Sequence, residues 1–213
     1  MKKAKPKIDR NACRIITPEF RVSYPHLFTP QKQPSGDKLK FSVTMLFPKD
    51  QELIGTSPPD AEGNTEPRSI KKVIAAAKRL EFGAKENWPE KMRSPIGDGD
   101  DEEKKDKSGY AGHWIISASW REENPPQIFG PDLKPLTKAS ELYPGCYARA
   151  VVFAYVWEFM KKRGVGFILD GVQKTRDGEP FGGKRPLDKV FAPIESTEVD
   201  DDSDEDEDDE EDF

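Results

Sequence analysis

The sequence has little cysteine, little histidine and no long apolar run. Two cysteines, Cys13 and Cys146, are too few for a disulfide framework and indicate reduced thiols inside a cell. With His26 and His113 as the only histidines, no Cys/His spacing resembles a zinc site, so we expect no metal and no cofactor. No segment reaches the roughly 20 apolar residues of a membrane span, and no apolar stretch follows the basic N-terminus as in a signal peptide. These absences predict a cytoplasmic protein with no membrane partner.

Catalytic motifs are also missing. No phosphate-binding GxxxxGK[ST] sequence occurs, and Gly164-Val165-Gly166 lacks the third glycine of a dinucleotide fingerprint. Neither histidine has a nucleophile motif nearby. A nuclease would need carboxylates on a rigid frame, whereas the acidic residues near 100 lie in the low-complexity segment 97–109. These carboxylates are Asp98, Asp100, Asp101, Glu102 and Glu103. We therefore expect no enzyme, and a metal-dependent nuclease is the weakest of three hypotheses.

Charge is separated along the chain. Residues 195–213 hold 14 acidic side chains and no Lys or Arg, which leaves 34 basic and 26 acidic side chains in residues 1–194, a net of +8. Such a like-charge block cannot bury enough apolar area to offset chain entropy. The sequence therefore predicts a basic domain over residues 1–194 and a disordered acidic tail over residues 195–213.

Five segments of the basic part alternate as strands do, and one has the pattern of a helix. The strands are expected over residues 12–24 with a bend at Pro18, 39–47, 114–120, 145–159 and 165–173. Ser69 is expected to cap an amphipathic helix that ends near Gly83. The segments between them are expected to be long loops, mobile in the case of 97–109. This order favours a mainly β fold, an OB-fold-like five-stranded barrel with one helix, over an immunoglobulin-like sandwich.

The segment 145–159 has two unlike faces when it is considered as a strand. Its even positions, from Cys146 to Val156, are small or β-branched and suit the interior of a tight barrel. Its odd positions carry aromatic rings and Arg149. This aromatic face has three interpretations: a second packed layer, the seam of a homo-oligomer, or a platform on which nucleic-acid bases stack.

Four segments, taken in order, resemble the bacteriophage-encoded single-stranded DNA-binding protein family. They are RVSYPHLF (21–28), KFSVTMLFPK (40–49), YPGCYARA (143–150) and GVGFILDGVQKTRDGEPFGGKRP (164–186). The resemblance implies an OB-type barrel, often with an acidic tail that ends in an aromatic residue. It also implies a role in DNA binding and a regulatory role for the tail, but no list of contact residues.

The candidate DNA-binding residues therefore come from the pattern alone. A cationic groove that follows phosphates and flat rings that stack on bases are what single-stranded DNA requires. The residues are Arg21, Lys38, Lys40, Trp114, Tyr147, Arg149, Phe153, Tyr155, Trp157, Lys174 and Arg176.

The acidic tail is expected to compete with DNA for this groove, because a tethered polyanion reaches an effective concentration that approaches mM. Its terminal residues are the candidate contact for replication or recombination proteins. They are Asp208, Asp209, Glu210, Glu211, Asp212 and Phe213. The preferred hypothesis is thus a protein that coats single-stranded DNA. The second hypothesis is an interaction protein whose tail mimics nucleic acid.

Overall fold

The computed structural model describes residues 10–32 and 38–182, and within these residues the fold is mainly β with one α-helix, as predicted. The predicted disordered tail and its terminal residues lie outside the described residues. The elements in chain order are β1 (Arg14–Ile16), β2 (Phe20–Lys32), β3 (Leu39–Pro48), β4 (Ile54–Thr56), β5 (Pro67–Ser69), α1 (Ile70–Phe82), β6 (Ile96–Asp98), β7 (His113–Arg121), β8 (Gln127–Phe129), β9 (Tyr147–Phe159) and β10 (Lys162–Arg176).

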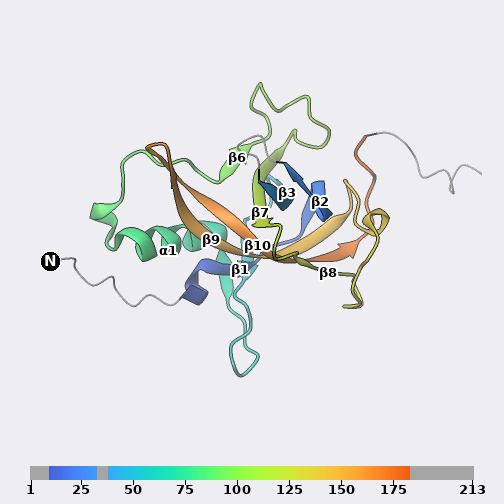
Figure 1. Cartoon of the computed structure of the whole chain (residues 1–213), viewed down its shortest axis with the longest axis horizontal. Coiled ribbons are helices and arrows are strands. Elements are labelled where there is room, and N and C mark those ends of the chain that lie inside the picture. The colour runs from blue at the N-terminus through green and yellow to red at the C-terminus, as the bar shows by residue number, and fades with distance from the viewer. Residues whose placement is uncertain (1–9, 33–37, 183–213) are drawn as a thin grey trace, which may run out of the picture. The chain divides into compact units, whose positions relative to one another are not determined.

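The five long strands form a ring (Figure 1). The hydrogen-bonded order is β9–β2–β3–β7–β10, and β10 pairs back to β9. Four of these pairs are antiparallel. The closing pair β7–β10 is parallel and joins only two residues on each strand, so the ring is not quite a full barrel. This is the OB-like architecture that the sequence predicts, and the sandwich alternative was wrong.

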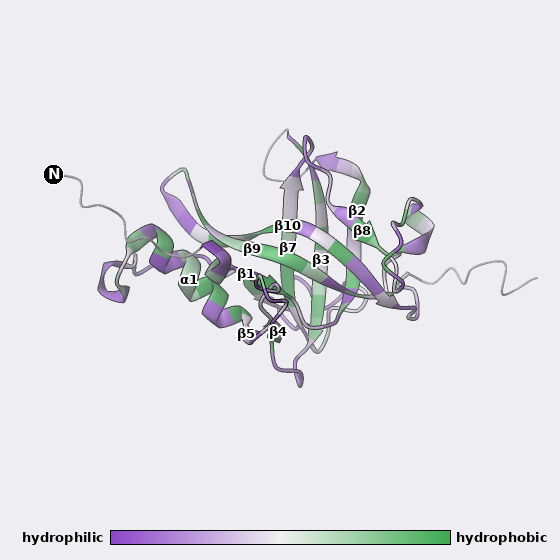
Figure 2. Ribbon diagram, turned by 90° about the horizontal axis from the view of Figure 1, so that it is seen from below, coloured by the Kyte–Doolittle hydropathy of each residue, from purple (hydrophilic) through white to green (hydrophobic). Residues whose placement is uncertain are grey.

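The alternation of β9 sets the inside of the ring. Its even residues from Cys146 to Ala154 are buried, while the odd residues from Tyr147 to Trp157 are exposed or half-buried. Larger side chains from the facing strands fill the remaining space, among them Phe20 and Phe47, whose rings meet edge to face with centroids 5.6 Å apart. Figure 2 shows hydrophobic residues along the middle of β3, β7, β9 and β10. The predicted barrel interior is therefore confirmed.

Helix α1 begins and ends where its sequence predicts. The Ser69 side chain accepts a hydrogen bond from the backbone N–H of Lys72, and Gly83 is the C-cap residue. Ile70, Val73 and Ala77 are buried on one stripe against the main core. No helix among residues 10–32 and 38–182 is long and apolar enough to cross a membrane.

Three of the predicted loops contain strands. β2 continues to Lys32 through a segment that was expected to be a loop. Its pairing with β3 skips from Ser23 to His26 and then to Gln31. Pro25 and Pro30 lie in the skipped positions, so the strand does not need the backbone N–H that proline lacks. Residues 48–68 contain β4 and the first two residues of β5, which pairs with β4, and residues 124–144 contain β8. These three-residue strands are too short for a periodic signal.

The charged segment 97–109, expected to be a mobile loop, is anchored at its start. β6 pairs with β7, and the Asp100 carboxylate accepts a hydrogen bond from the backbone N–H of Gly112 at 2.7 Å. Lys49 Nζ lies 2.7 Å from the other oxygen of the same carboxylate. The prediction therefore missed a strand and two anchoring contacts.

Candidate nucleic-acid interface

One row of residues crosses the outside of the ring from β2 to β1. In the strand pairing, each member of the row is the register partner of the next. None of the members is buried, whereas their chain neighbours Val43, Ala118 and Phe167 are buried. We call this set the outer row. It consists of His26, Ser42, Ser119, Ile168, Phe153 and Arg14.

The middle of this face is lined by small hydroxyl side chains. Two residues along from Ser42 and Ser119, Thr44 Oγ1 and Ser117 Oγ lie 3.3 Å apart across the β3–β7 pair. Small side chains leave space above the strands, and hydroxyls both donate and accept hydrogen bonds. This part of the surface can therefore hold a polar chain without large rearrangement.

A cationic hollow of about 710 Å³ lies at one end of β3 and β7. Lys40 and Arg121 are paired in register there, and Lys38 lies beside them. Among the described residues, these three cations form no ion pair. Lys32 and Leu39 also line the hollow, and Glu122 and Glu123 reduce its net positive charge. The hollow brings together two predicted DNA-binding residues, Lys38 and Lys40, and adds Arg121.

A second hollow, of about 330 Å³, contains the β9 and β1 end of the outer row. Phe153 and Trp120 supply flat rings, and Arg10 and Arg14 supply charge. Arg14 is held 3.0 Å from the Asp170 carboxylate. Of these residues the sequence predicted only Phe153. Trp120 was assigned to a strand but not to the site, and Arg10 and Arg14 carry no distinguishing motif.

Tyr155 and Trp157 extend the aromatic face along β9. Each ring lies over a glycine of β10 that is its partner in register, Tyr155 over Gly166 and Trp157 over Gly164. Burial raises the pKa of Tyr155, although Arg121 nearby opposes the shift. Beyond Trp157, the tip of the hairpin exposes Phe159 by 62% and Met160 by 79%.

Four of the predicted residues lie instead where β9 begins and β10 ends. Arg176 stacks on the Tyr147 ring with its guanidinium carbon 3.3 Å from the ring centroid, and it pairs with Glu19 at 2.7 Å. Arg21 donates to the backbone oxygens of Gly145 and Glu179. Lys174 Nζ lies 2.7 Å from Asp177. These cations already have partners within the protein, about 20 Å along β9 from Phe153.

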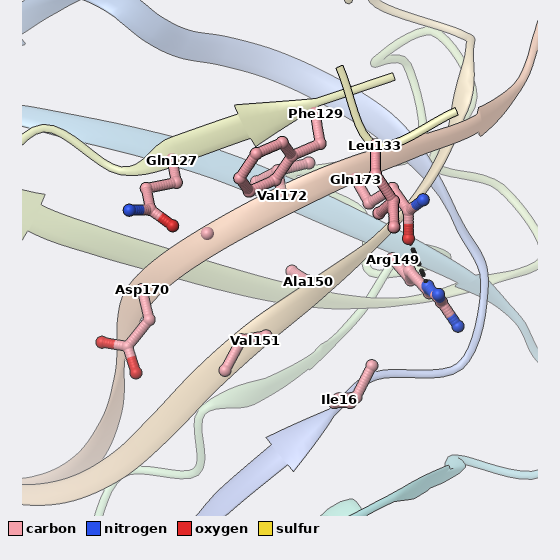
Figure 3. Close-up of a pocket in the computed structure, with 11 residues that line it drawn as sticks. Ile16, Gln127, Phe129, Leu133, Arg149, Ala150, Val151, Asp170, Val172 and Gln173 are labelled. Carbon is pink, nitrogen blue, oxygen red and sulfur yellow. Dashed lines mark hydrogen bonds between the residues drawn. The ribbon is translucent and has the colours of Figure 1, made fainter. Parts of the chain in front are cut away.

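Arg149 and Trp114 lie apart from both groups. Arg149 Nε donates to Gln173 Oε1 at 2.8 Å at the edge of an apolar pocket lined by Ile16, Phe129 and Leu133 (Figure 3). Trp114 packs partly against the main core, with Lys49 Nζ 4.9 Å from its ring centroid. The structure therefore does not bring these two residues to the outer row.

The carboxylates considered for a nuclease have another partner. Asp98 and Asp100 both contact Lys49, and hydrogen bonds from this lysine lower the pKa of both carboxyl groups. In the described part of the chain, no three His, Cys, Asp or Glu side chains are grouped as metal ligands would be. These contacts fit the interpretation of the segment as surface charge.

Known proteins resemble this chain in both sequence and structure. A family model described as the ssDNA-binding protein of Enterobacter phage Enc34 matches residues 13–208. The structure of the single-stranded DNA-binding protein from bacteriophage Enc34 in complex with ssDNA is 25% identical, with a TM-score of 0.61, over 85% of this chain and all of that one. A second structure of the Enc34 protein is 26% identical, with a TM-score of 0.58, over 90% of this chain and 97% of that one.

A C-terminally truncated form of the same Enc34 protein gives 27% identity and a TM-score of 0.59, over 84% of this chain and 97% of that one. Among curated proteins, no sequence matches significantly. The family match spans nearly the whole described region and all of its long strands. This chain therefore belongs to the family of phage single-stranded DNA-binding proteins that is represented by the Enc34 protein.

Proposed function

We propose that this phage single-stranded DNA-binding protein coats DNA without regard to base sequence during replication or recombination in the host cytoplasm. The outer row, with a cationic hollow beside its β3 and β7 members and an aromatic hollow at its β9 and β1 end, is the observation that carries the proposal. Cations follow phosphates, and rings stack on any base because every base has a π-face. The related Enc34 protein has been solved in complex with ssDNA, which supports the assignment.

The row sets the direction and length of the proposed DNA path. Six strands spaced about 4.8 Å apart give roughly 24 Å along the sheet. At about 3.4 Å per stacked nucleotide, this length corresponds to about seven nucleotides, within the range of a single OB fold. The DNA therefore crosses the strands instead of running along one of them, with Lys38, Lys40 and Arg121 on phosphates and Phe153 and Trp120 on bases.

The salt dependence of binding tests this path. Replacing Lys40 or Arg121 by Gln should lower the slope of log K against log salt by about 0.7 per lost phosphate contact. Lys71→Gln, on the exposed face of α1, is the matched control and should leave the slope unchanged. The measurement is a fluorescence titration with homopolymer oligonucleotides at several salt concentrations. Equal slopes in all three variants would exclude this hollow as a phosphate-binding site. Failure of the wild type to bind the oligonucleotides at low salt would exclude the proposed function.

The acidic tail is proposed to compete with DNA for the same cations. Its 14 carboxylates on the same chain form a permanent local competitor for a basic site. Removal of residues 195–213 should tighten binding to single-stranded DNA, and the gain should shrink at high salt because screening weakens the competition. A full-length chain whose tail carboxylates are replaced by amides should match the truncated form. Equal or weaker binding by the truncated protein would contradict the competition.

We also propose that DNA binding releases the tail for replication or recombination proteins, with Asp208 to Phe213 as the contact. An aromatic side chain beside a free carboxylate suits a basic pocket on a partner. Phe213→Ala should lose co-purification with such proteins from infected cells and keep its affinity for DNA. If the change lowers DNA affinity instead, the terminal aromatic acts within the chain and not on a partner.

A further inference from the structure

Tyr24 has a backbone conformation that bulky residues rarely adopt. Its φ is +45°, in the left-handed region that favours glycine and asparagine. It lies in the irregular part of β2, where pairing with β3 skips from Ser23 to His26. The residue is 52% exposed, so burial of the side chain does little to offset this cost. Strained residues that are not explained by the core occur often at ligand sites.

The Tyr24 ring is supported on one side by a fixed partner. It stacks on Tyr110 with ring centroids 6.5 Å apart and planes inclined by 25°. Tyr110 is only 5% exposed and belongs to a small cluster with Leu46 and Ile115 on the outside of the ring. The Tyr110 hydroxyl also interacts with the side chains of Ser23 and Thr44, and its burial raises the pKa of this phenol. Tyr110 is thus held in place, and it holds Tyr24.

The pair borders the proposed DNA path. Ser23 is the register partner of Thr44, and Thr44 contacts Ser117 on the hydroxyl-lined part of the same face. His26, two residues after Tyr24, begins the outer row. Lys107 Nζ lies 5.5 Å from the Tyr110 ring centroid and adds a cation at this border. An exposed ring, a rigid support and a nearby cation are the parts of a stacking site for a base.

We propose that Tyr24, supported by Tyr110, is a nucleobase-stacking platform at the β2 end of the interface, opposite Phe153 and Trp120. The inference rests on the proposed DNA path and extends it to a second aromatic border. A base leaving the hydroxyl-lined centre would cover the exposed side of Tyr24, so the strained backbone serves to present the ring in advance of binding.

The test compares Tyr24→Asn with Tyr24→Phe. Asparagine tolerates the left-handed conformation, so Tyr24→Asn should fold with a thermal midpoint at or above that of the wild type. It should bind oligo-dT roughly 5- to 150-fold more weakly, the range expected for one lost base stack. Tyr24→Phe keeps the ring and should bind as the wild type does. An abasic oligonucleotide of equal length has no base to stack, so all three proteins should bind it equally.

Two outcomes separate this inference from the function on which it rests. If Phe153→Ala weakens binding to oligo-dT and Tyr24→Asn does not, the platform is excluded and the interface stands. If the wild type fails to bind oligo-dT, the function itself is excluded. Photocrosslinking of the wild type to an iodouracil oligonucleotide supplies a measurement without any variant, and Tyr24 should be among the crosslinked residues. Crosslinks confined to other residues would overturn the platform.

Discussion

Two glycines of β10 leave room for two aromatic rings of β9. A Cβ on Gly164 would lie 2.6 Å from the Trp157 ring, and one on Gly166 would lie 3.1 Å from the Tyr155 ring. Any larger residue at either position would therefore push the opposite ring away from the sheet. The two glycines therefore determine where the Trp157 and Tyr155 rings lie on the sheet.

Gly164→Ala should consequently act through Trp157. The added methyl group displaces the indole, which changes its environment while the buried even positions of β9 stay in place. We expect a shifted tryptophan emission, a small change in thermal midpoint and weaker binding to oligo-dT. The measurement compares Gly164→Ala in the wild type with the same change in a Trp157→Phe background, where the emission shift should vanish. A shift that persists in that background would place the effect elsewhere.

At the scale of elements, Glu19 joins the bend between β1 and β2 to the end of β10. Its carboxylate accepts hydrogen bonds from Thr175 Oγ1 at 2.6 Å and from both Nε and Nη2 of Arg176, at 3.1 and 2.7 Å. Burial alone would raise the pKa of Glu19, but the hydrogen bonds from Arg176 and Thr175 outweigh it and lower the pKa. The ionised carboxylate therefore stabilises the folded state.

Glu19→Gln should accordingly cost stability that depends on pH. A carboxylate with a lowered pKa contributes its full stabilisation at neutral pH and loses it as the pH falls below roughly 4. Because both partners are partly exposed, we expect a loss of about 0.5–1 kcal/mol at neutral pH. Urea unfolding across pH measures the difference, and the two curves should converge in acid. Glu62→Gln, on the exposed β4–β5 connection, is the control and should show no such difference.

The elements that the sequence predicts are those with enough residues to show a period. β9 alternates over thirteen residues and α1 carries a cap at each end, so both could be placed within a few residues. β4, β5 and β8 have three residues each and show no period. The irregular pairing around Tyr24 depends on partners from β3 and from residue 110, which are distant in sequence.

The sequence predicted which kinds of residue form the candidate site, but only some of their positions. Alternation shows that Phe153 and Tyr155 share a face, and the structure places Phe153 in the outer row and Tyr155 two residues along β9 from it. Alternation also puts Tyr147 on that face, but the length of β9 separates it from Phe153, and Arg176 covers its ring. Trp120 was missed because the hollow forms only where β1, β7, β9 and β10 meet residues 10 and 11, which are distant from Trp120 in sequence. Side-chain partners of this kind are set by tertiary structure.

At the scale of the whole molecule, family membership confirms a phage single-stranded DNA-binding protein and not an enzyme. The proposed functions of the acidic tail and the individual contact residues remain predictions. The prediction for the tail follows from the charge separation between residues 1–194 and 195–213, and it implies that DNA binding by the full chain depends on ionic strength.

The closure of the ring through two residues on β7 and two on β10 has a mechanical consequence. Such a junction should open locally at lower free energy than the β9–β10 ribbon, which pairs over nearly its full length. Amide hydrogens at this junction should therefore exchange with solvent sooner than those between β9 and β10, as mass spectrometry can measure. Ser119 and Ile168 are register partners at this junction. A DNA strand bound along the outer row would contact both strands there and slow the local opening. Equal exchange with and without oligonucleotide would show that the ligand passes elsewhere.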